Sequence, residues 1–298
     1  MIVLADSRAY AEWLLEGAVR WLGRGEFVAD ESDRALREAL LGEGDLEAGL
    51  AAGEWAWERF AILERAARSQ WDALVELCSG PGLARTVAAF AGTGAGFHGQ
   101  HGRPWASPAG NIHLVAHFRP QTPAANLGFT LVPALAALDT VDAWAAPAAA
   151  PGIKWINDIV ADSRKLGGVI AWSRTSGATV RDAIVGIGLN VERAPELAEP
   201  GLPPAALREI ARAPADCAVP AVLRVLLERL AARWDEFRAA GLHPLLDEYR
   251  RRSTVLGREV AVRDGSGALI RGRVVAIGDE LELFLEGRDE PLRSGRIA

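Results

Sequence analysis

The 298-residue sequence predicts an α+β protein, in which a mixed sheet with helices is followed by a small β-barrel. Strand-like and helical runs alternate through the middle of the chain, and apolar residues recur on one helical face over residues 219–240. Glycine and aspartate turns punctuate the last 45 or so residues. We therefore expect an acidic helical N-terminal extension (1–58), a central domain (59–252) and a C-terminal barrel (253–298).

Apolar periodicity and turn residues place the individual elements. In the extension, the start signal Asp30-Glu31-Ser32 favours a helix over residues 33–41. Further helices are expected at residues 70–77, 127–138, 219–240 and 245–252. Central strands are expected at residues 60–63, 86–90, 111–119, 152–155, 166–171 and 183–191. Barrel strands are expected at residues 258–263, 268–277 and 280–285.

Composition argues against several classes of protein. The net charge of −6 disfavours a general nucleic-acid binder, which would carry a basic face. No apolar run approaches the roughly 18 residues of a membrane span, and the first residues lack the features of a signal peptide. Cys78 and Cys217 have no metal-ligand spacing. We expect a cytoplasmic protein with two inert thiols and neither nucleic-acid nor membrane partners.

One long stretch has an unusual charge pattern. Residues 77–138 contain no Asp or Glu, yet they hold three arginines and four of the five histidines. These cations are Arg85, Arg103, Arg119, His98, His101, His113 and His117. An acid-free, cation-bearing stretch in an acidic protein suits an anionic ligand such as a nucleotide phosphate. A buried sheet with few charges of any kind is the alternative.

Lysine is scarce in this chain. Of the 33 basic residues two are lysines, Lys154 and Lys165, and Asn157 and Asp158 lie between them. Lysine is a compact point charge and arginine a broad fork, so the two are not interchangeable. A chain so biased towards arginine is expected to keep lysine where the chemistry requires it.

The loop Gly94-x-Gly96-x-x-Gly99 matches a dinucleotide-binding fingerprint, but its context does not. The fingerprint requires a helix directly afterwards and an acidic residue about twenty positions on. Pro104 and Pro108 follow instead. Residues 97–103 are then either an anion-binding nest of backbone N–H groups or an ordinary surface loop.

Three later segments can also carry chemistry. Lys154-Trp-Ile-Asn-Asp158 places charge and an amide at a strand end, where a salt bridge with an Asx turn explains the pattern equally well. Lys165 precedes Gly167 and Gly168, and Gly186-Ile-Gly-Leu-Asn190 ends on a polar side chain. Glycines in a strand allow a ligand or neighbouring backbone to approach closely.

Other catalytic classes find little support in the sequence. The five histidines form no ligand-like cluster, although His113 and His117 share a strand face. No Gly-x-Ser-x-Gly elbow or Cys–His signature indicates a hydrolase.

Taken together, the segments resemble the biotin protein ligase family in order and spacing, over about 240 of the 298 residues. In chain order, the family's motifs are a Ser-Thr-Asn-like turn, a Gly-Arg-Gly-Arg-x-Gly-Arg-x-Trp loop, Ser-Pro-x-Gly-Asn, Lys-Trp-Pro-Asn-Asp, Lys-Leu-x-Gly and Gly-Ile-Gly-Ile-Asn-Val. The counterparts here are Arg68-Ser-Gln70, Gly102-Arg-Pro-Trp105, Ser107-Pro-Ala-Gly-Asn111, Lys154-Trp-Ile-Asn-Asp158, Lys165-Leu-Gly-Gly168 and Gly186-Ile-Gly-Leu-Asn-Val191. The resemblance implies a catalytic fold shared with lipoate ligases and related to class II tRNA synthetases, followed by an SH3-like domain.

The chain departs from the family pattern at the glycine-rich loop. His98, Gln100 and His101 stand where the family has arginines, and Phe97 replaces a glycine. Gly94 falls where the family has a biotin-contacting Gln, and Ser69-Gln70 replaces a Thr-Asn pair. The extension does not look like the DNA-binding head of repressor-type members.

The resemblance implies ATP-dependent formation of biotinyl-adenylate and transfer of biotin to a lysine of a biotin carboxyl carrier domain. By matching motifs, Lys165 would meet the carboxylate and the adenylate, Asp158 would orient the acceptor amine or bind Mg²⁺, and Arg103 would bind phosphate. The other nucleotide residues implied are Gly99, Gln100, His101, Gly102, Lys154, Asn157 and Asn190. The other biotin residues implied are Ser69, Gln70, Gly94, His98, Trp105 and Gly167.

Two rival functions and the oligomeric state stay open at this point. A lipoate or octanoate ligase would use the same core with a longer apolar pocket. A non-catalytic binding protein would keep the fold without turnover. A homodimer is compatible with the sequence.

Overall fold

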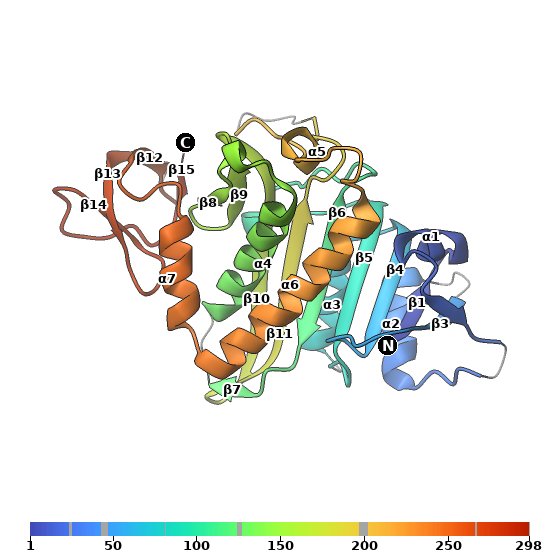
Figure 1. The fold of residues 1–298 in the computed structure, drawn as a ribbon. Helices are drawn as coiled ribbons and strands as arrows, with labels where there is room; N and C mark the ends of the chain where they lie inside the picture. Colours follow the sequence, from blue (N-terminus) through green and yellow to red (C-terminus); the bar gives the residue numbers. More distant parts are fainter. Residues whose placement is uncertain are drawn as a thin grey trace.

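The computed structural model describes residues 1–23, 26–42, 47–80, 82–123, 127–196, 202–265 and 267–297. Within these residues an eleven-stranded mixed sheet carries helices on both faces, and a separate four-stranded antiparallel sheet lies near the C-terminus (Figure 1). The expected α+β class is confirmed. No helix of the described residues is long and apolar enough to cross a membrane.

The strands of the large sheet follow the expected runs and add several short ones. They are β1 (Ile2–Ala5), β2 (Val19–Trp21), β3 (Glu47–Ala51), β4 (Arg59–Ala66), β5 (Val87–Gly94), β6 (Ile112–Phe118), β7 (Thr122–Pro123), β8 (Gly152–Lys154), β9 (Asp158–Ala161), β10 (Arg164–Ser176) and β11 (Thr179–Leu189). Their order is β2-β3-β1-β4-β5-β6-β11-β10-β9-β8, and β7 pairs with β11.

The helices pack on the two faces of this sheet. They are α1 (Arg8–Leu14), α2 (Glu31–Leu41), α3 (Gln70–Ser79), α4 (Gly128–Trp144), α5 (Leu207–Ile210), α6 (Val219–Ala240) and α7 (His243–Arg252). Helices α4 and α6 cover one face, where Trp234 stacks on Phe118 with ring centroids 4.2 Å apart. Helices α2 and α3 cover the other face, and the candidate site lies beside α3.

Helix α4 is apolar on nearly all sides because it lies between the sheet and α6. A helix buried all round has no polar face to interrupt its hydrophobic pattern. It runs through Pro133, as expected from the sequence.

The N-terminal extension is only partly helical, which corrects the expectation for residues 1–58. Both α1 and α2 are present, but β1, β2 and β3 add to the large sheet, with β1 parallel to β4. Strand β1 has four residues, and a run that short shows no periodicity to separate strand from helix.

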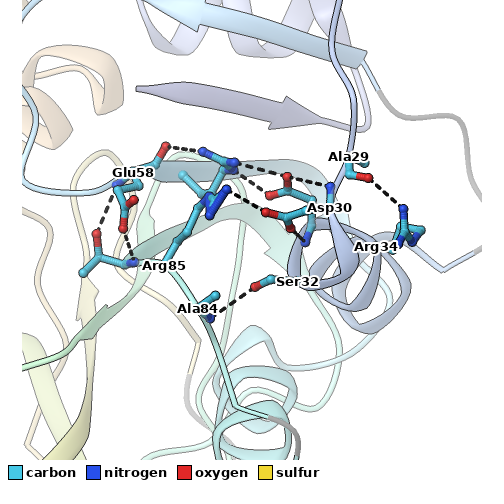
Figure 2. Close-up of polar contacts among 10 residues, drawn as sticks. Ala29, Asp30, Ser32, Arg34, Glu58, Ala84 and Arg85 are labelled. Atoms are coloured by element: carbon cyan, nitrogen blue, oxygen red, sulfur yellow. Dashed lines mark hydrogen bonds and ion pairs between the residues drawn. The ribbon is translucent and has the colours of Figure 1, made fainter. Parts of the chain in front are cut away.

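Helix α2 begins at Glu31, within the predicted start signal and two residues before the expected position 33, and its first turn is tied to the sheet. Asp30 caps the helix in a reciprocal capping box with Asp33. The guanidinium of Arg59 on β4 donates to the buried Asp33 carboxylate at 2.6 and 3.1 Å. Figure 2 shows the neighbouring contacts, in which Arg85 pairs with Asp30 and the Ala84 N–H donates to the hydroxyl of Ser32. These contacts fasten the extension to the central part of the molecule.

The small sheet contacts the central part at the end of β8. Its strands, in the order β14-β13-β12-β15, are β12 (Glu259–Arg263), β13 (Leu269–Ile277), β14 (Leu283–Leu285) and β15 (Arg296–Ile297). The indole N–H of Trp155 donates to the Leu281 carbonyl at 2.5 Å, and the Lys154 ammonium donates to the Ile297 carbonyl at 2.9 Å. Strand β15, which the sequence did not indicate, therefore ends beside the Lys154–Asp158 segment.

Candidate functional site

A cavity of about 430 Å³ opens on the α3 face of the large sheet. A row of directly paired residues crosses its floor from β6 to β8. His113 pairs with Gly188, Gly188 with Gly168, Gly168 with Asp158, and Asp158 with Lys154. Paired residues in adjacent strands point to the same face of a sheet. The row thus places a histidine at one end of the cavity, two glycines in the middle and charged groups at the other end.

The charged end is centred on an ion pair. The Lys165 ammonium lies 2.5 Å from Asp158, with 29% and 24% of the two side chains exposed. The same ammonium lies 5.4 Å from the centre of the Trp105 ring, in a cation–π arrangement. Lys165 is therefore held between a carboxylate and an aromatic face while staying accessible from the cavity.

Three more cations line the same end, namely Lys154, Arg103 and Arg296. Burial lowers the pKa of Lys154, and the nearby charges of Arg296, Lys165 and Arg103 lower it further, while Asp158 opposes them. Asp158 and Glu196 are the carboxylates among the described lining residues. This excess of positive charge suits a polyanionic ligand.

The middle of the cavity is shaped by two glycines and two tryptophans. A Cβ on Gly188 would lie 2.4 Å from the Trp105 ring, and a Cβ on Gly186 would lie 3.1 Å from the Trp71 ring. Both glycines therefore let an indole ring lie directly on β11. The resulting wall is apolar and flat.

The glycine-rich loop is anchored to α3. The Nε2 atom of His98 lies 2.8 Å from the Asp72 carboxylate, and this hydrogen bond raises the pKa of His98. Phe97 covers Gly94, where a Cβ would lie 2.5 Å from its ring. The loop contains a short 3₁₀ turn over Gln100–Gly102.

The cavity brings together most of the residues that the sequence singled out. Those that line it are Ser69, Gln70, His98, Gly99, Gln100, Arg103, Trp105, Lys154, Asn157, Asp158, Lys165 and Asn190. Those that do not line it are Gly94, His101, Gly102 and Gly167. Gly94 is under Phe97, and His101 and Gly102 are exposed on the outside of the loop.

Gly167 is absent from the lining because of an irregularity in β10. Pairing with β9 shifts between Lys165 and Gly167, so that Gly168 pairs with Asp158. A bulge of one residue reverses which side chains face the cavity. Gly168, and not Gly167, therefore lies beside the Lys165 ammonium.

Several of the lining residues also hold the fold together. The buried Asn190 amide donates to the carbonyls of Ala205 and Lys165, and the Asn157 amide donates to the Val169 carbonyl. The Gln70 amide donates to the His113 carbonyl at 2.8 Å, and Ser69 caps α3. The Asn157 contact is not the Asx turn of the structural alternative, but the segment does carry a salt bridge, between Asp158 and Lys165.

Sequence reasoning missed Trp71, His113, Arg296 and Glu196 as lining residues. Trp71 had a signal, since it directly follows Ser69-Gln70 at the start of α3. His113 was noted for a metal and not for this cavity. Arg296 is far from the other lining residues in sequence, and only the docking of β15 beside β8 brings it there.

The acid-free stretch contributes fewer cations to the cavity than expected. Of its three arginines, Arg103 lines the cavity. Arg85 pairs with Asp30, and Arg119 donates to the Ala84 carbonyl, both away from the site. Much of the stretch forms β5 and β6, so the buried-sheet alternative accounts for its lack of acidic residues.

Folding also gathers Cys78, His117 and Asp182, whose potential ligand atoms lie within 4.8 Å of one another. Burial alone would raise the pKa of Asp182, but hydrogen bonds from His117 and Arg174 outweigh it and lower that pKa. Burial raises the pKa of the Cys78 thiol to about 12, so the thiol stays protonated. Because the carboxylate is already paired, we interpret the group as a buried polar cluster.

Comparison with known proteins gives consistent similarities. Residues 89–190 match the model of the biotin/lipoate A/B protein ligase family. The chain is 33% identical over 214 residues to the biotin–[acetyl-CoA-carboxylase] ligase of Paracoccus denitrificans, covering 70% of this chain and 87% of that protein. It is 30% identical over 271 residues to the protein of the same name from Mycobacterium tuberculosis. That alignment covers 89% of this chain and 94% of that protein.

Among solved structures, the fold is similar to that of the biotin protein ligase from Aquifex aeolicus in complex with biotin and ATP. The TM-score is 0.64 at 21% identity, covering 81% of this chain and 98% of that one.

Proposed function

Because the chain belongs to the biotin/lipoate A/B protein ligase family, we propose that it is a biotin–protein ligase. It uses ATP to activate biotin as biotinyl-adenylate and transfers biotin to a lysine of a biotin carboxyl carrier domain. The observation that carries the proposal is the cavity in which Lys165, Asp158 and Lys154 meet beside an apolar wall. The names of the two relatives above, and the biotin and ATP of the solved structure, support the choice of substrates.

In the first step, a biotin carboxylate oxygen attacks the α-phosphorus of ATP, and the bond to pyrophosphate breaks. Lys165 attracts the carboxylate and then stabilises the negative charge that develops on the phosphate. Its ion pair with Asp158 and its contact with Trp105 hold it in place before substrate arrives. Fixed charges of this kind act mainly through positioning and electrostatic stabilisation.

The phosphates lie at the cationic end of the cavity. Arg103, Lys154 and Arg296 neutralise them. The Gly99 N–H already donates to the Arg103 carbonyl at 2.8 Å, so the backbone N–H of Gln100 is the donor that this part of the loop adds. Mg²⁺ would bind together with the phosphates, and Asp158 or Glu196 would supply its protein carboxylate ligand. When bound, it offsets phosphate charge.

In the second step, the uncharged amine of the acceptor lysine attacks the acyl carbon of the adenylate, and AMP leaves. Asp158 accepts a hydrogen bond from that amine and directs its lone pair. Because Asp158 also pairs with Lys165, the same carboxylate links the residues of both steps.

A second candidate is a ligase for lipoate or octanoate. Phe97 covers Gly94, where family members have a polar residue for biotin, and this makes the loop side of the cavity more apolar. An apolar acid would tolerate that change better than a ureido ring would.

Exchange of labelled pyrophosphate into ATP, with biotin, lipoate, octanoate or no acid, separates these functions. We expect exchange with biotin. Exchange with lipoate or octanoate alone would identify the second candidate, and no exchange with any acid would favour a binding protein. Light scattering on the same preparation tests the homodimer that the sequence leaves open.

A further inference from the structure

His113 is a buried histidine at the end of the cavity opposite Lys165. It lines the cavity, only 5% of it is exposed, and its ring lies 5.3 Å from that of Phe97. The roles proposed above for the reaction leave His113 unused.

The hydrogen bonds of His113 decide which ring nitrogen carries the proton. Nδ1 lies 3.2 Å from the Ala91 carbonyl oxygen, which can only accept, so Nδ1 is the donor. Burial lowers the pKa of His113 to about 4, so the ring is neutral at physiological pH. A neutral ring protonated on Nδ1 has a lone pair on Nε2. Within the described residues, Nε2 has no hydrogen-bond partner.

We infer that His113 Nε2 is a specificity-determining acceptor, which binds an N–H group at the far end of the acid substrate. This inference rests on the proposed function and deepens it. The substrate class is a carboxylic acid with an N–H donor remote from its carboxylate, as in the cyclic urea of biotin. An acid without that N–H, such as octanoate, offers Nε2 no donor.

The spacing of the strands agrees with a substrate of this length. The Lys165 ammonium lies 3.5 Å from the Cβ position of Gly168, so it marks the place of the carboxylate over β10. From Gly168 the row passes through Gly188 to His113, which is two strand spacings or about 10 Å. Trp105 lies on Gly188 between the two ends and supplies the apolar wall along which the acyl chain runs.

Titration calorimetry with biotin and, separately, with ATP tests the inference on the full chain. His113→Phe keeps a ring against Phe97 but removes the acceptor, and we expect biotin to bind at least ten-fold more weakly. His113→Gln keeps an acceptor oxygen near the position of Nε2, and we expect less than a three-fold loss. ATP affinity should change less than two-fold in both variants.

A second measurement uses only the wild-type protein, so misfolding of a variant cannot obscure it. Biotin methylated on either ureido nitrogen is titrated in turn, and we expect at least one derivative to lose ten-fold or more in affinity.

The possible results separate the two proposals. If wild-type protein binds no biotin, the proposed function fails and the inference with it. If it binds biotin but His113→Phe binds biotin equally well, or both methylated forms bind as well as biotin, the inference alone is overturned. Equal losses of biotin affinity in His113→Phe and His113→Gln would assign the effect to packing, and this result would also overturn the inference.

Discussion

The ammonium of Lys165 lies 2.5 Å from the carboxylate of Asp158, and a bulge in β10 sets which residues surround this pair. Lys165 pairs with Val160, but after the shift Gly168 pairs with Asp158. The bulge thus places a side-chain-free position beside the ammonium. A ligand carboxylate can approach Lys165 there without displacing Asp158.

Replacing Lys165 tests its electrostatic role. We expect Lys165→Ala to slow adenylate formation by two orders of magnitude or more, about 3 kcal/mol of barrier. The rate is measured in a single turnover with ATP and biotin. Arg224→Ala, an exposed position paired with Glu16, is the control and should react like wild type. A wild-type rate for Lys165→Ala would refute the assignment.

The contact between His98 and Asp72 predicts that adenylate retention depends on pH. The hydrogen bond to Asp72 raises the pKa of His98 above its ordinary 6.5, so the charged pair is complete below that pH. The pair is lost as pH rises through the raised pKa, and the loop is then held less firmly. We expect release of biotinyl-adenylate to accelerate over that range, measured by stopped-flow displacement. In Asp72→Asn the acceleration should begin at lower pH, and an unchanged profile would contradict the mechanism.

Arg296 tests whether the small C-terminal sheet takes part in nucleotide binding. It lines the cationic end of the cavity and contributes to the lowered pKa of Lys154. We expect Arg296→Ala to raise the KM for ATP about ten-fold and to leave the KM for biotin within two-fold, because a phosphate loses one charge-assisted contact. Arg293→Ala is the matched control, since Arg293 is exposed and pairs with Glu280, both in segments that connect the strands of the small sheet. Equal effects of the two variants on the KM for ATP would remove Arg296 from the site.

The N-terminal extension should stabilise the fold through one buried ion pair. Asp33→Ala leaves the Arg59 guanidinium buried without its carboxylate, and we expect a loss of about 3 kcal/mol in the free energy of unfolding. Arg85→Ala removes the more exposed pair with Asp30 shown in Figure 2 and should cost under about 1 kcal/mol. Urea denaturation measures both. Similar losses in the free energy of unfolding for the two variants would mean that burial does not make the Asp33–Arg59 pair more important for stability than the exposed pair.

Most long elements could be predicted because each carries its own periodic signal. The helix expected at residues 219–240 has those bounds in the structure, since apolar residues mark one face throughout. Strands β1, β2, β3, β7, β9 and β15 were not predicted. Each has five residues or fewer, and they become strands by pairing with neighbours that lie elsewhere in the sequence.

The sequence by itself determined which chemical groups the site can use. The two lysines of an arginine-rich chain, and the motifs around them, indicated an adenylating site, and both lysines line the cavity. The tertiary structure alone decided which of the other residues face that cavity. The bulge replaces Gly167 by Gly168, β15 brings in Arg296, and the row from β6 to β8 sets His113 opposite Lys165. The sequence gives the type of each residue directly. Strand register and the docking of distant segments depend instead on contacts between residues far apart in the chain.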